Sequence, residues 1–197
     1  MSLVVGITGG IGSGKTTISQ FFNDLGIPVY NADDEAKKLM LSPRIKKQLI
    51  QLLGSESFTE KGLNRDFVRE QIFKDEGLRQ KINDIVHPEV GRHFRDWLKR
   101  QDAPYVLKEA AIIFEEGLSD QYDCIITVYA DEELRVQRLL KRSGLTRQMI
   151  QNIMEKQWSD EKKIAFSDYS ILNNDLKKAR QKTVEIHHKL LERSQNL

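Results

Sequence analysis

Apolar residues near the start of the chain follow the pattern of a strand, a helix and a second strand. Residues 3–8 form a short, nearly all-apolar run that ends in glycines, which is typical of a strand buried on both faces of a parallel sheet. Beyond the glycines, apolar residues recur at helical spacing as far as Gly26, a residue type that commonly ends helices. Residues 27–30 then predict a second short strand.

The pattern changes between residues 32 and 101, where successive amphipathic stripes predict several helices with no strand among them. We interpret residues 36–103 as a helical subdomain that encloses a second substrate. It is inserted into a core formed by residues 1–35 and 104–197. A set of crossover helices belonging to the sheet itself is the alternative.

Strand character returns at residues 105–107, at residues 124–129 and, more weakly, at residues 169–172. Helical stretches separate these segments, and a last amphipathic helix is expected from about residue 175 to 192. Strands and helices that alternate in this way predict an α/β fold with a parallel sheet.

Composition and charge place the chain among ordinary globular proteins. It has 197 residues, of which 39% are hydrophobic, and a formal net charge of +2. That charge is too close to balance for a protein that coats nucleic acid or lies on a membrane surface, so any anion site must be local. Cys124 is the single cysteine, which excludes an internal disulfide framework. We expect a cytoplasmic protein with no nucleic-acid, membrane or obligate protein partner.

The segment between the first strand and the first helix carries a phosphate-binding pattern. Residues 9–16 consist of a glycine, four further residues and then Gly-Lys-Thr. Glycines let backbone N–H groups point at a phosphate, and the helix N-terminus adds partial positive charge. Lys15 is expected to reach the β- and γ-phosphates, and the Thr16 hydroxyl is the expected Mg²⁺ ligand.

This loop alone does not separate a small-molecule kinase from a GTPase switch or an ATP-driven motor. The chain has no Asn/Thr-Lys-x-Asp and no Asp-x-x-Gly segment, which argues against the switch. Asp33 follows the second strand, where the ligand crevice of such a sheet lies, and a kinase needs a carboxylate there to accept the proton of the attacking hydroxyl. Capping of the next helix by Asn31 or Asp33 is the alternative role.

Three arginines, Arg135, Arg138 and Arg142, recur at helical spacing and form one basic face. They predict a lid over about residues 135–160, in which the arginines neutralise charge on the transferring phosphoryl group and exclude water. A solvated charged face is the alternative.

Together these segments resemble the dephospho-CoA kinase family over nearly the whole chain. The resemblance rests on the loop from Ile7 to Thr16 and on later segments that include Asn31-Ala32-Asp33, His87-Pro88, Phe114-Glu115, Gln157 and Asn173. This sequence departs from the family pattern at Asn31, where the family has Asp, at Ala110-Ala111, where it has Pro-Leu, and at Ser167, where it has Ala.

The resemblance implies a P-loop kinase fold with a five-stranded parallel sheet between helical layers, a helical acceptor-binding insertion and a helical lid. It implies transfer of the ATP γ-phosphate to the ribose 3′-hydroxyl of dephospho-CoA, with Mg²⁺, in the last step of coenzyme A synthesis. The implied catalytic residues are Asp33, as the base, Lys15, Arg138 and Arg142. The implied ATP-binding residues are Gly10, Ile11, Gly12, Ser13, Gly14, Lys15, Thr16, Thr17 and Asn173, the last of these near the adenine.

On the acceptor side, the resemblance points to Asp33, His87 and Phe114, although a buried histidine before a helix that starts at Pro88 is an alternative for His87. Glu109 is a candidate to hold Mg²⁺ through water beside Thr16, and a salt bridge at the end of a strand is the alternative. Two other functions remain open from the residues: a nucleoside or nucleotide monophosphate kinase, and an ATP-binding regulatory module without transferase activity.

Overall fold

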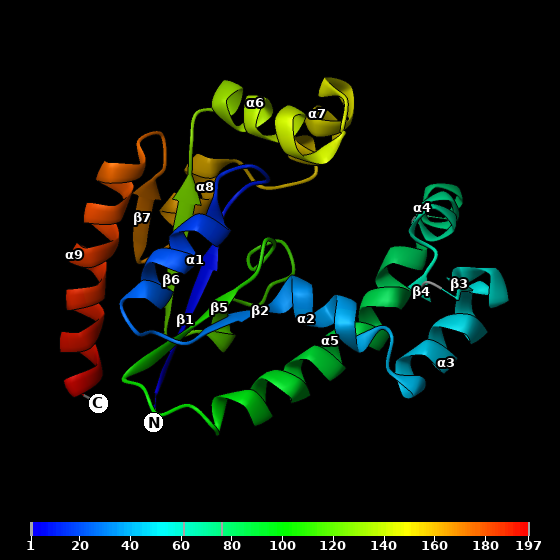
Figure 1. The fold of residues 1–197 in the computed structure, drawn as a ribbon, viewed down its shortest axis with the longest axis horizontal. Helices are drawn as coiled ribbons and strands as arrows, with labels where there is room; N and C mark the ends of the chain where they lie inside the picture. Colours follow the sequence, from blue (N-terminus) through cyan, green and yellow to red (C-terminus); the bar gives the residue numbers. More distant parts are fainter. Residues whose placement is uncertain (1, 61, 76, 197) are drawn as a thin grey trace. The chain divides into compact units, whose positions relative to one another are not determined.

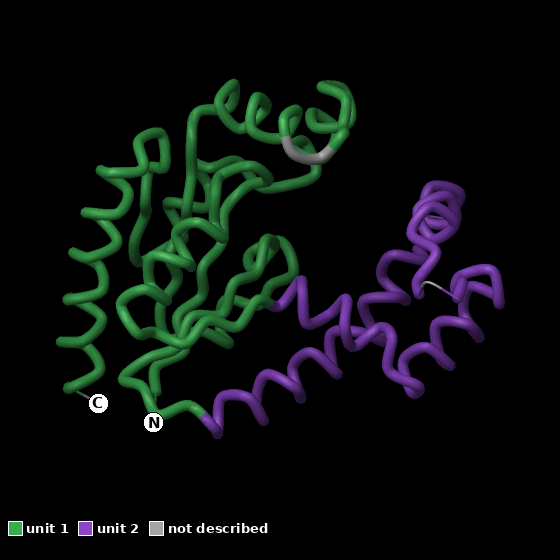
Figure 2. The backbone as a smooth tube through the Cα atoms, viewed as in Figure 1, with its two compact units in different colours: residues 1–31, 101–197 green, residues 32–100 purple. Residues whose placement is uncertain are grey.

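The computed structural model describes residues 2–60, 62–75 and 77–196 of the chain. These residues divide into two compact units, one made of residues 1–31 and 101–197 and the other of residues 32–100 (Figure 2). The larger unit is built from two separate stretches of the chain, and the smaller unit is the continuous stretch between them.

A parallel sheet of five strands forms the centre of the larger unit (Figure 1). Its strands, in spatial order, are β2 (Val29–Asn31), β5 (Tyr105–Glu109), β1 (Leu3–Thr8), β6 (Cys124–Tyr129) and β7 (Tyr169–Leu172). All four neighbouring pairs are parallel. The predicted α/β fold with five parallel strands is therefore confirmed.

Helices and a loop segment cover both faces of this sheet, as a parallel sheet requires. Alternate strand residues such as Val5 and Ile126 pack on one face against α1 (Lys15–Asp24) and α9 (Leu176–Gln195). On the other face Ile125 packs with residues that follow β5, including Ile113 and Phe114. The short helix α8 (Asp160–Ala165) also lies against β6 on that side. A short 3-10 helix, η2 (Ser119–Gln121), comes directly before β6 in the chain.

The segment after β6 forms a smaller helical cluster of the same unit. It comprises α6 (Glu132–Ser143) and α7 (Arg147–Glu155). Val136, Leu139 and Ile150 are buried between these helices, and Ile11 of the glycine-rich loop packs against them. The helices expected over residues 135–160 are thus held by apolar contacts against the predicted phosphate-binding loop.

The smaller unit is mainly helical. It contains α2 (Ala32–Leu39), α3 (Pro43–Leu53), α4 (Arg65–Lys74) and α5 (Gly77–Leu98), with η1 (Ser55–Ser57) between α3 and a short hairpin. The hairpin pairs β3 (Phe58–Thr59) with β4 (Gly62–Leu63) in antiparallel register. The expectation of no strand in this region is therefore wrong, because strands of two residues are too short to show an alternating pattern.

The alternative for His87 in which a helix starts at Pro88 is also wrong. Pro88 lies inside the 22-residue helix α5. Ile82, Val86, Val90 and Phe94 are buried at intervals of four residues along α5, so one packed face continues past the proline and sustains the helix. None of the helices in the described part of the chain is long and apolar enough to cross a membrane.

Candidate active site

The glycine-rich loop joins β1 to α1 at the end of the sheet where its strands finish. Gly12 and Gly14 have φ values of 79° and 90°, in the left-handed region that favours glycine. Gly14 is the residue immediately before α1, and a Cβ there would collide with the side-chain amide of Asn173. Glycine is required at this position both by its backbone conformation and by the close approach of Asn173.

Side chains from distant segments hold the backbone of this loop. The Asn173 side-chain amide donates to the Ser13 carbonyl at 2.8 Å, and the Ile11 N–H donates to Oε1 of Gln157 at 2.8 Å. Arg135 Nε donates to the Ile11 carbonyl at 2.9 Å. The loop is therefore fixed before any ligand binds, which lowers the ordering cost of binding a phosphate.

Arg135 is a residue whose role sequence reasoning missed. Its side chain is only 10% exposed, and Nη1 forms an ion pair with Asp160 at 2.8 Å while Nε reaches the Ile11 carbonyl. A solvated face is therefore the wrong interpretation for this arginine. The signal was its position one turn before Arg138 on the same helical face, but only the tertiary structure shows that this face meets the loop.

Arg138 and Asn173 also form part of this site. Arg138 Nη2 donates to the Asn173 carbonyl at 2.7 Å. Among the described residues, three buried polar atoms here have no hydrogen-bond partner: Arg138 Nη1, Asn173 Oδ1 and Ser13 Oγ. A buried guanidinium nitrogen without a partner is costly unless a ligand satisfies it, so this corner suits an anion with further acceptors. Arg142 belongs to α6, but its side chain lies outside what the structure describes.

Lys15 is the first residue of α1, and its side chain folds back over the loop. The ammonium group donates to the Gly9 carbonyl at 2.9 Å and to the Gly10 carbonyl at 3.4 Å. These contacts keep the positive charge of the lysine beside the loop amides and the N-terminus of α1, where a phosphate is most strongly favoured.

Thr16 and Glu109 meet beside this loop. The Thr16 hydroxyl donates to Oε1 of Glu109 at 2.9 Å, and Glu109, at the end of β5, is 5% exposed. Both residues line a cavity of about 260 Å³ together with Asn31, which pairs in register with Glu109 across β2 and β5. Hydroxyl, carboxylate and amide oxygens are the ligand types that Mg²⁺ prefers, so these residues fit that ion.

Phe114 lies on the opposite face of the sheet from α1. It is 5% exposed and stacks on Trp158 with ring centroids 5.7 Å apart, while Phe166 packs at the edge of this pair and is 64% exposed. In the same region the fully buried Lys163 of α8 is paired with Glu115 at 2.8 Å. This aromatic cluster and its ion pair connect α8 to the segment after β5.

The two remaining predicted residues belong to the helical unit. Asp33 is exposed and is the second residue of α2, so it lies inside the first turn and is not the residue that caps this helix. His87 is exposed on α5, so the alternative of a buried histidine is wrong. A carboxylate in the first turn of a helix is stabilised in its ionised form by the helix dipole.

Comparisons with known proteins agree with this arrangement. Residues 3–178 match the sequence profile of the dephospho-CoA kinase family. A dephospho-CoA kinase of Bacteroides fragilis is 38% identical over 176 residues, which make up 88% of this chain and 86% of that protein. The crystal structure of TT1252 from Thermus thermophilus has a TM-score of 0.88 at 28% identity, covering 95% of this chain and 97% of that one.

A more distant structure shows the same fold. Dephospho-CoA kinase from Campylobacter jejuni has a TM-score of 0.71 at 21% identity, with 98% of each chain covered. The predicted family, enzyme class and ATP-dependent kinase activity in coenzyme A synthesis are thereby confirmed. The chain belongs to the dephospho-CoA kinase family.

Proposed function

We propose that this chain transfers the γ-phosphoryl group of ATP to the ribose 3′-hydroxyl of dephospho-CoA, with Asp33 as the general base. The observation that carries the proposal is the glycine-rich loop held by hydrogen bonds from the Arg135 and Asn173 side chains, with Thr16 bonded to Glu109 where β5 ends. In the reaction, the 3′-oxygen attacks the γ-phosphorus, the bond to the β-γ bridging oxygen breaks, and ADP leaves. The hydroxyl proton passes to the base.

The residues that hold the phosphates are Lys15, the loop amides from Gly10 to Thr17, and Arg138. Lys15 turns from the Gly9 carbonyl to the β- and γ-phosphates when the nucleotide binds. The partnerless Nη1 of Arg138 then donates to phosphate oxygens, and Arg142 acts from the same helix. Asn173 lies beside the adenine, with Oδ1 as its remaining acceptor.

Thr16 and Glu109 are the groups of this chain that would hold Mg²⁺. When bound, the ion supplies charge neutralisation on the β- and γ-phosphate oxygens. Glu109 is buried at the end of a central strand, so its carboxylate stays in place while the Thr16 hydroxyl turns from Glu109 toward the ligand.

Chain connectivity supports the role of Asp33. Asn31 ends β2 and lines the cavity that contains Thr16 and Glu109. Asp33 follows two residues later, and two residues of chain span at most about 7 Å. The backbone of Asp33 therefore lies within about 7 Å of Asn31, a residue that borders the proposed phosphate site. We assign residues 36–103 as the subdomain on which the acceptor binds, with His87, and also Phe114, as the residues that contact it.

The test replaces Asp33 with Asn. We expect Asp33→Asn to lower kcat by about 10² or more and to leave ATP binding nearly unchanged, because the lost role is confined to the transition state. Asp66→Asn is the matched control, since Asp66 is also the second residue of its helix and its side chain is 92% exposed. Near-normal turnover of Asp33→Asn would remove Asp33 from the mechanism.

The same assay separates the alternative functions. ADP release is measured with dephospho-CoA, with nucleosides and with nucleoside monophosphates as acceptors. Turnover with nucleoside monophosphates instead of dephospho-CoA would favour a nucleotide kinase, and nucleotide binding without any transfer would favour a regulatory module.

A further inference from the structure

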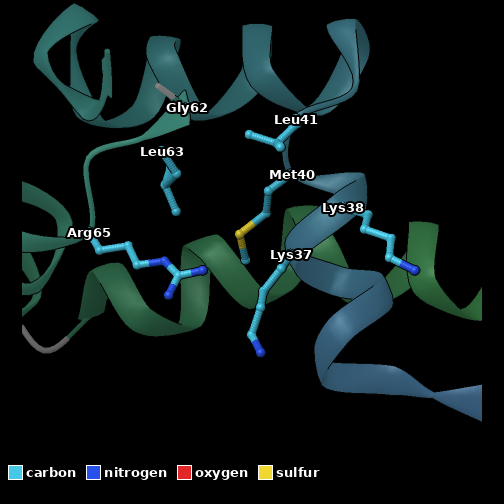
Figure 3. A pocket seen from close by; sticks show the side chains of 7 residues that line it. All are labelled: Lys37, Lys38, Met40, Leu41, Gly62, Leu63 and Arg65. Carbon is cyan, nitrogen blue, oxygen red and sulfur yellow. The ribbon is translucent and has the colours of Figure 1, made fainter. Parts of the chain in front are cut away.

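The helical unit contains a cavity of about 360 Å³, and none of the individual residues given a role above lines it. It lies between the second half of α2 and the segment from β4 to the start of α4 (Figure 3). Its lining residues are Lys37, Lys38, Met40, Leu41, Gly62, Leu63 and Arg65. Three of these are basic, none is acidic, and the others are apolar apart from glycine.

The basic and apolar groups face the same space. Figure 3 shows the side chains of Met40, just after α2, and Arg65, at the start of α4, extending toward one another, with Leu63 above them. Lys37 extends from α2 beside Met40, while Lys38 points away. Arg65 forms no ion pair with another described residue. The Lys37 ammonium is paired with Asp34 at 2.6 Å, but both side chains are more than half exposed. Such an exposed pair contributes little to stability, so an incoming anion can displace it.

The position of this cavity along α2 relates it to Asp33. Residues separated by four or by seven positions share one face of a helix, so Asp33, Lys37 and Met40 lie in a row. With a rise of about 1.5 Å per residue, Lys37 is about 6 Å and Met40 about 10 Å along the axis from Asp33. A ligand whose hydroxyl meets Asp33 would next meet a cation and then a thioether and leucine side chains.

We propose that this cavity is the subsite for the diphosphate and the amide arm of the acceptor. The inference rests on the proposed function, because it takes the hydroxyl at Asp33 to be that of the acceptor. Lys37 and Arg65 bind the diphosphate, since an ammonium and a guanidinium from different elements can contact separate phosphate oxygens. Met40, Leu41 and Leu63 cover the flexible arm, whose methyl and methylene groups gain from apolar contact.

The experiment measures by calorimetry how tightly dephospho-CoA binds to the protein. The protein is first saturated with a non-hydrolysable ATP analogue, so that dephospho-CoA cannot bind in the nucleotide site. We expect Lys37→Ala and Arg65→Ala each to weaken binding about tenfold, as the loss of a hydrogen bond to a charged group does. Met40→Ala should weaken it about threefold to fivefold through lost apolar contact. In turnover assays, KM for dephospho-CoA rises in the same proportion while kcat and KM for ATP stay unchanged.

Lys74→Ala is the matched control. Lys74 is paired with Glu70 on the same helical unit at 2.6 Å and is 60% exposed, against 54% for Lys37, but it does not line the cavity. Equal affinity of Lys37→Ala, Arg65→Ala and the unaltered protein would overturn the subsite, and so would an equal loss in Lys74→Ala.

Failure of the proposed function is distinguishable from failure of the subsite. If the unaltered protein binds dephospho-CoA without transferring phosphate to it, and Lys37→Ala and Arg65→Ala lose that binding, the function is wrong and the subsite stands. If transfer occurs and the variants bind normally, the function stands and the subsite is wrong.

Discussion

Removal of the Arg135 guanidinium tests whether the ion pair with Asp160 holds the phosphate-binding loop. Arg135→Met keeps an unbranched side chain but leaves Asp160 without its partner, and it also removes the donor to the Ile11 carbonyl. Breaking a fully buried pair costs about 3–5 kcal/mol. Because the side chains of Arg135 and Asp160 are still 10% and 15% exposed, we expect the free energy of unfolding to fall by an amount near the low end of that range, about 3 kcal/mol. For a chain of this size, the Tm falls by about 6–12 °C.

The loss should depend on pH in a defined direction. Burial raises the pKa of Asp160 above its ordinary value, and the Arg135 guanidinium lowers it only in part. A carboxyl whose pKa is higher in the folded than in the unfolded state contributes stability that is lost as pH rises through the folded pKa. Without Arg135 that pKa rises further, so the destabilisation of Arg135→Met grows between pH 5 and pH 7.5.

Urea unfolding at both pH values, followed by circular dichroism, measures this effect. The double variant Arg135→Met with Asp160→Asn removes the stranded carboxylate. The free energy of unfolding of the double variant should therefore lie only about 1 kcal/mol below that of the unaltered protein, which is the contribution of the lost hydrogen bond to Ile11. The extra pH dependence should also disappear. KM for ATP should rise in both variants, because the Ile11 carbonyl loses its donor. Wild-type stability of Arg135→Met at pH 7.5, or a double variant no more stable than the single one, would refute this reasoning.

Two further outcomes are expected. Lys15→Ala should lower kcat/KM for ATP by about 10²–10³-fold without a change in unfolding midpoint, because its ammonium acts on the transferred phosphates, and an unchanged kcat/KM would contradict that role. Cys124 is 1% exposed and burial raises the pKa of its thiol to about 12, so a thiol reagent at pH 8 should label it only when urea unfolds the protein; prompt labelling of the native chain would place this strand nearer the surface.

The sheet could be predicted from the sequence because each strand is encoded by its own residues. The run from Leu3 to Thr8 and the run from Cys124 to Tyr129 are buried on both faces, and a continuous apolar segment is the direct consequence. The hairpin at residues 58–63 has too few residues to create such a signal. At Pro88 the local preference of proline favoured a helix start as the alternative, but packing of Val86 and Val90 on the same face carries the helix through this residue.

The loop between β1 and α1 was predictable for the same local reason: the glycines, Lys15 and Thr16 are neighbours in the chain, and their spacing alone predicts a phosphate-binding loop. The structure adds what depends on distant residues. Gln157 reaches Ile11 across 146 positions and Asn173 reaches Ser13 across 160. No periodicity in the sequence relates such pairs.

The sequence by itself thus determined which main elements form and which segment has the pattern of a phosphate-binding loop, because backbone conformation and helix amphipathicity depend on residues a few positions apart. Only the tertiary structure decided that Arg135 faces inward, that Thr16 meets Glu109, and that Lys37 and Arg65 border one cavity. Those arrangements depend on how helices and strands pack. Packing brings together residues that are far apart in the sequence, so no local sequence pattern predicts their contact.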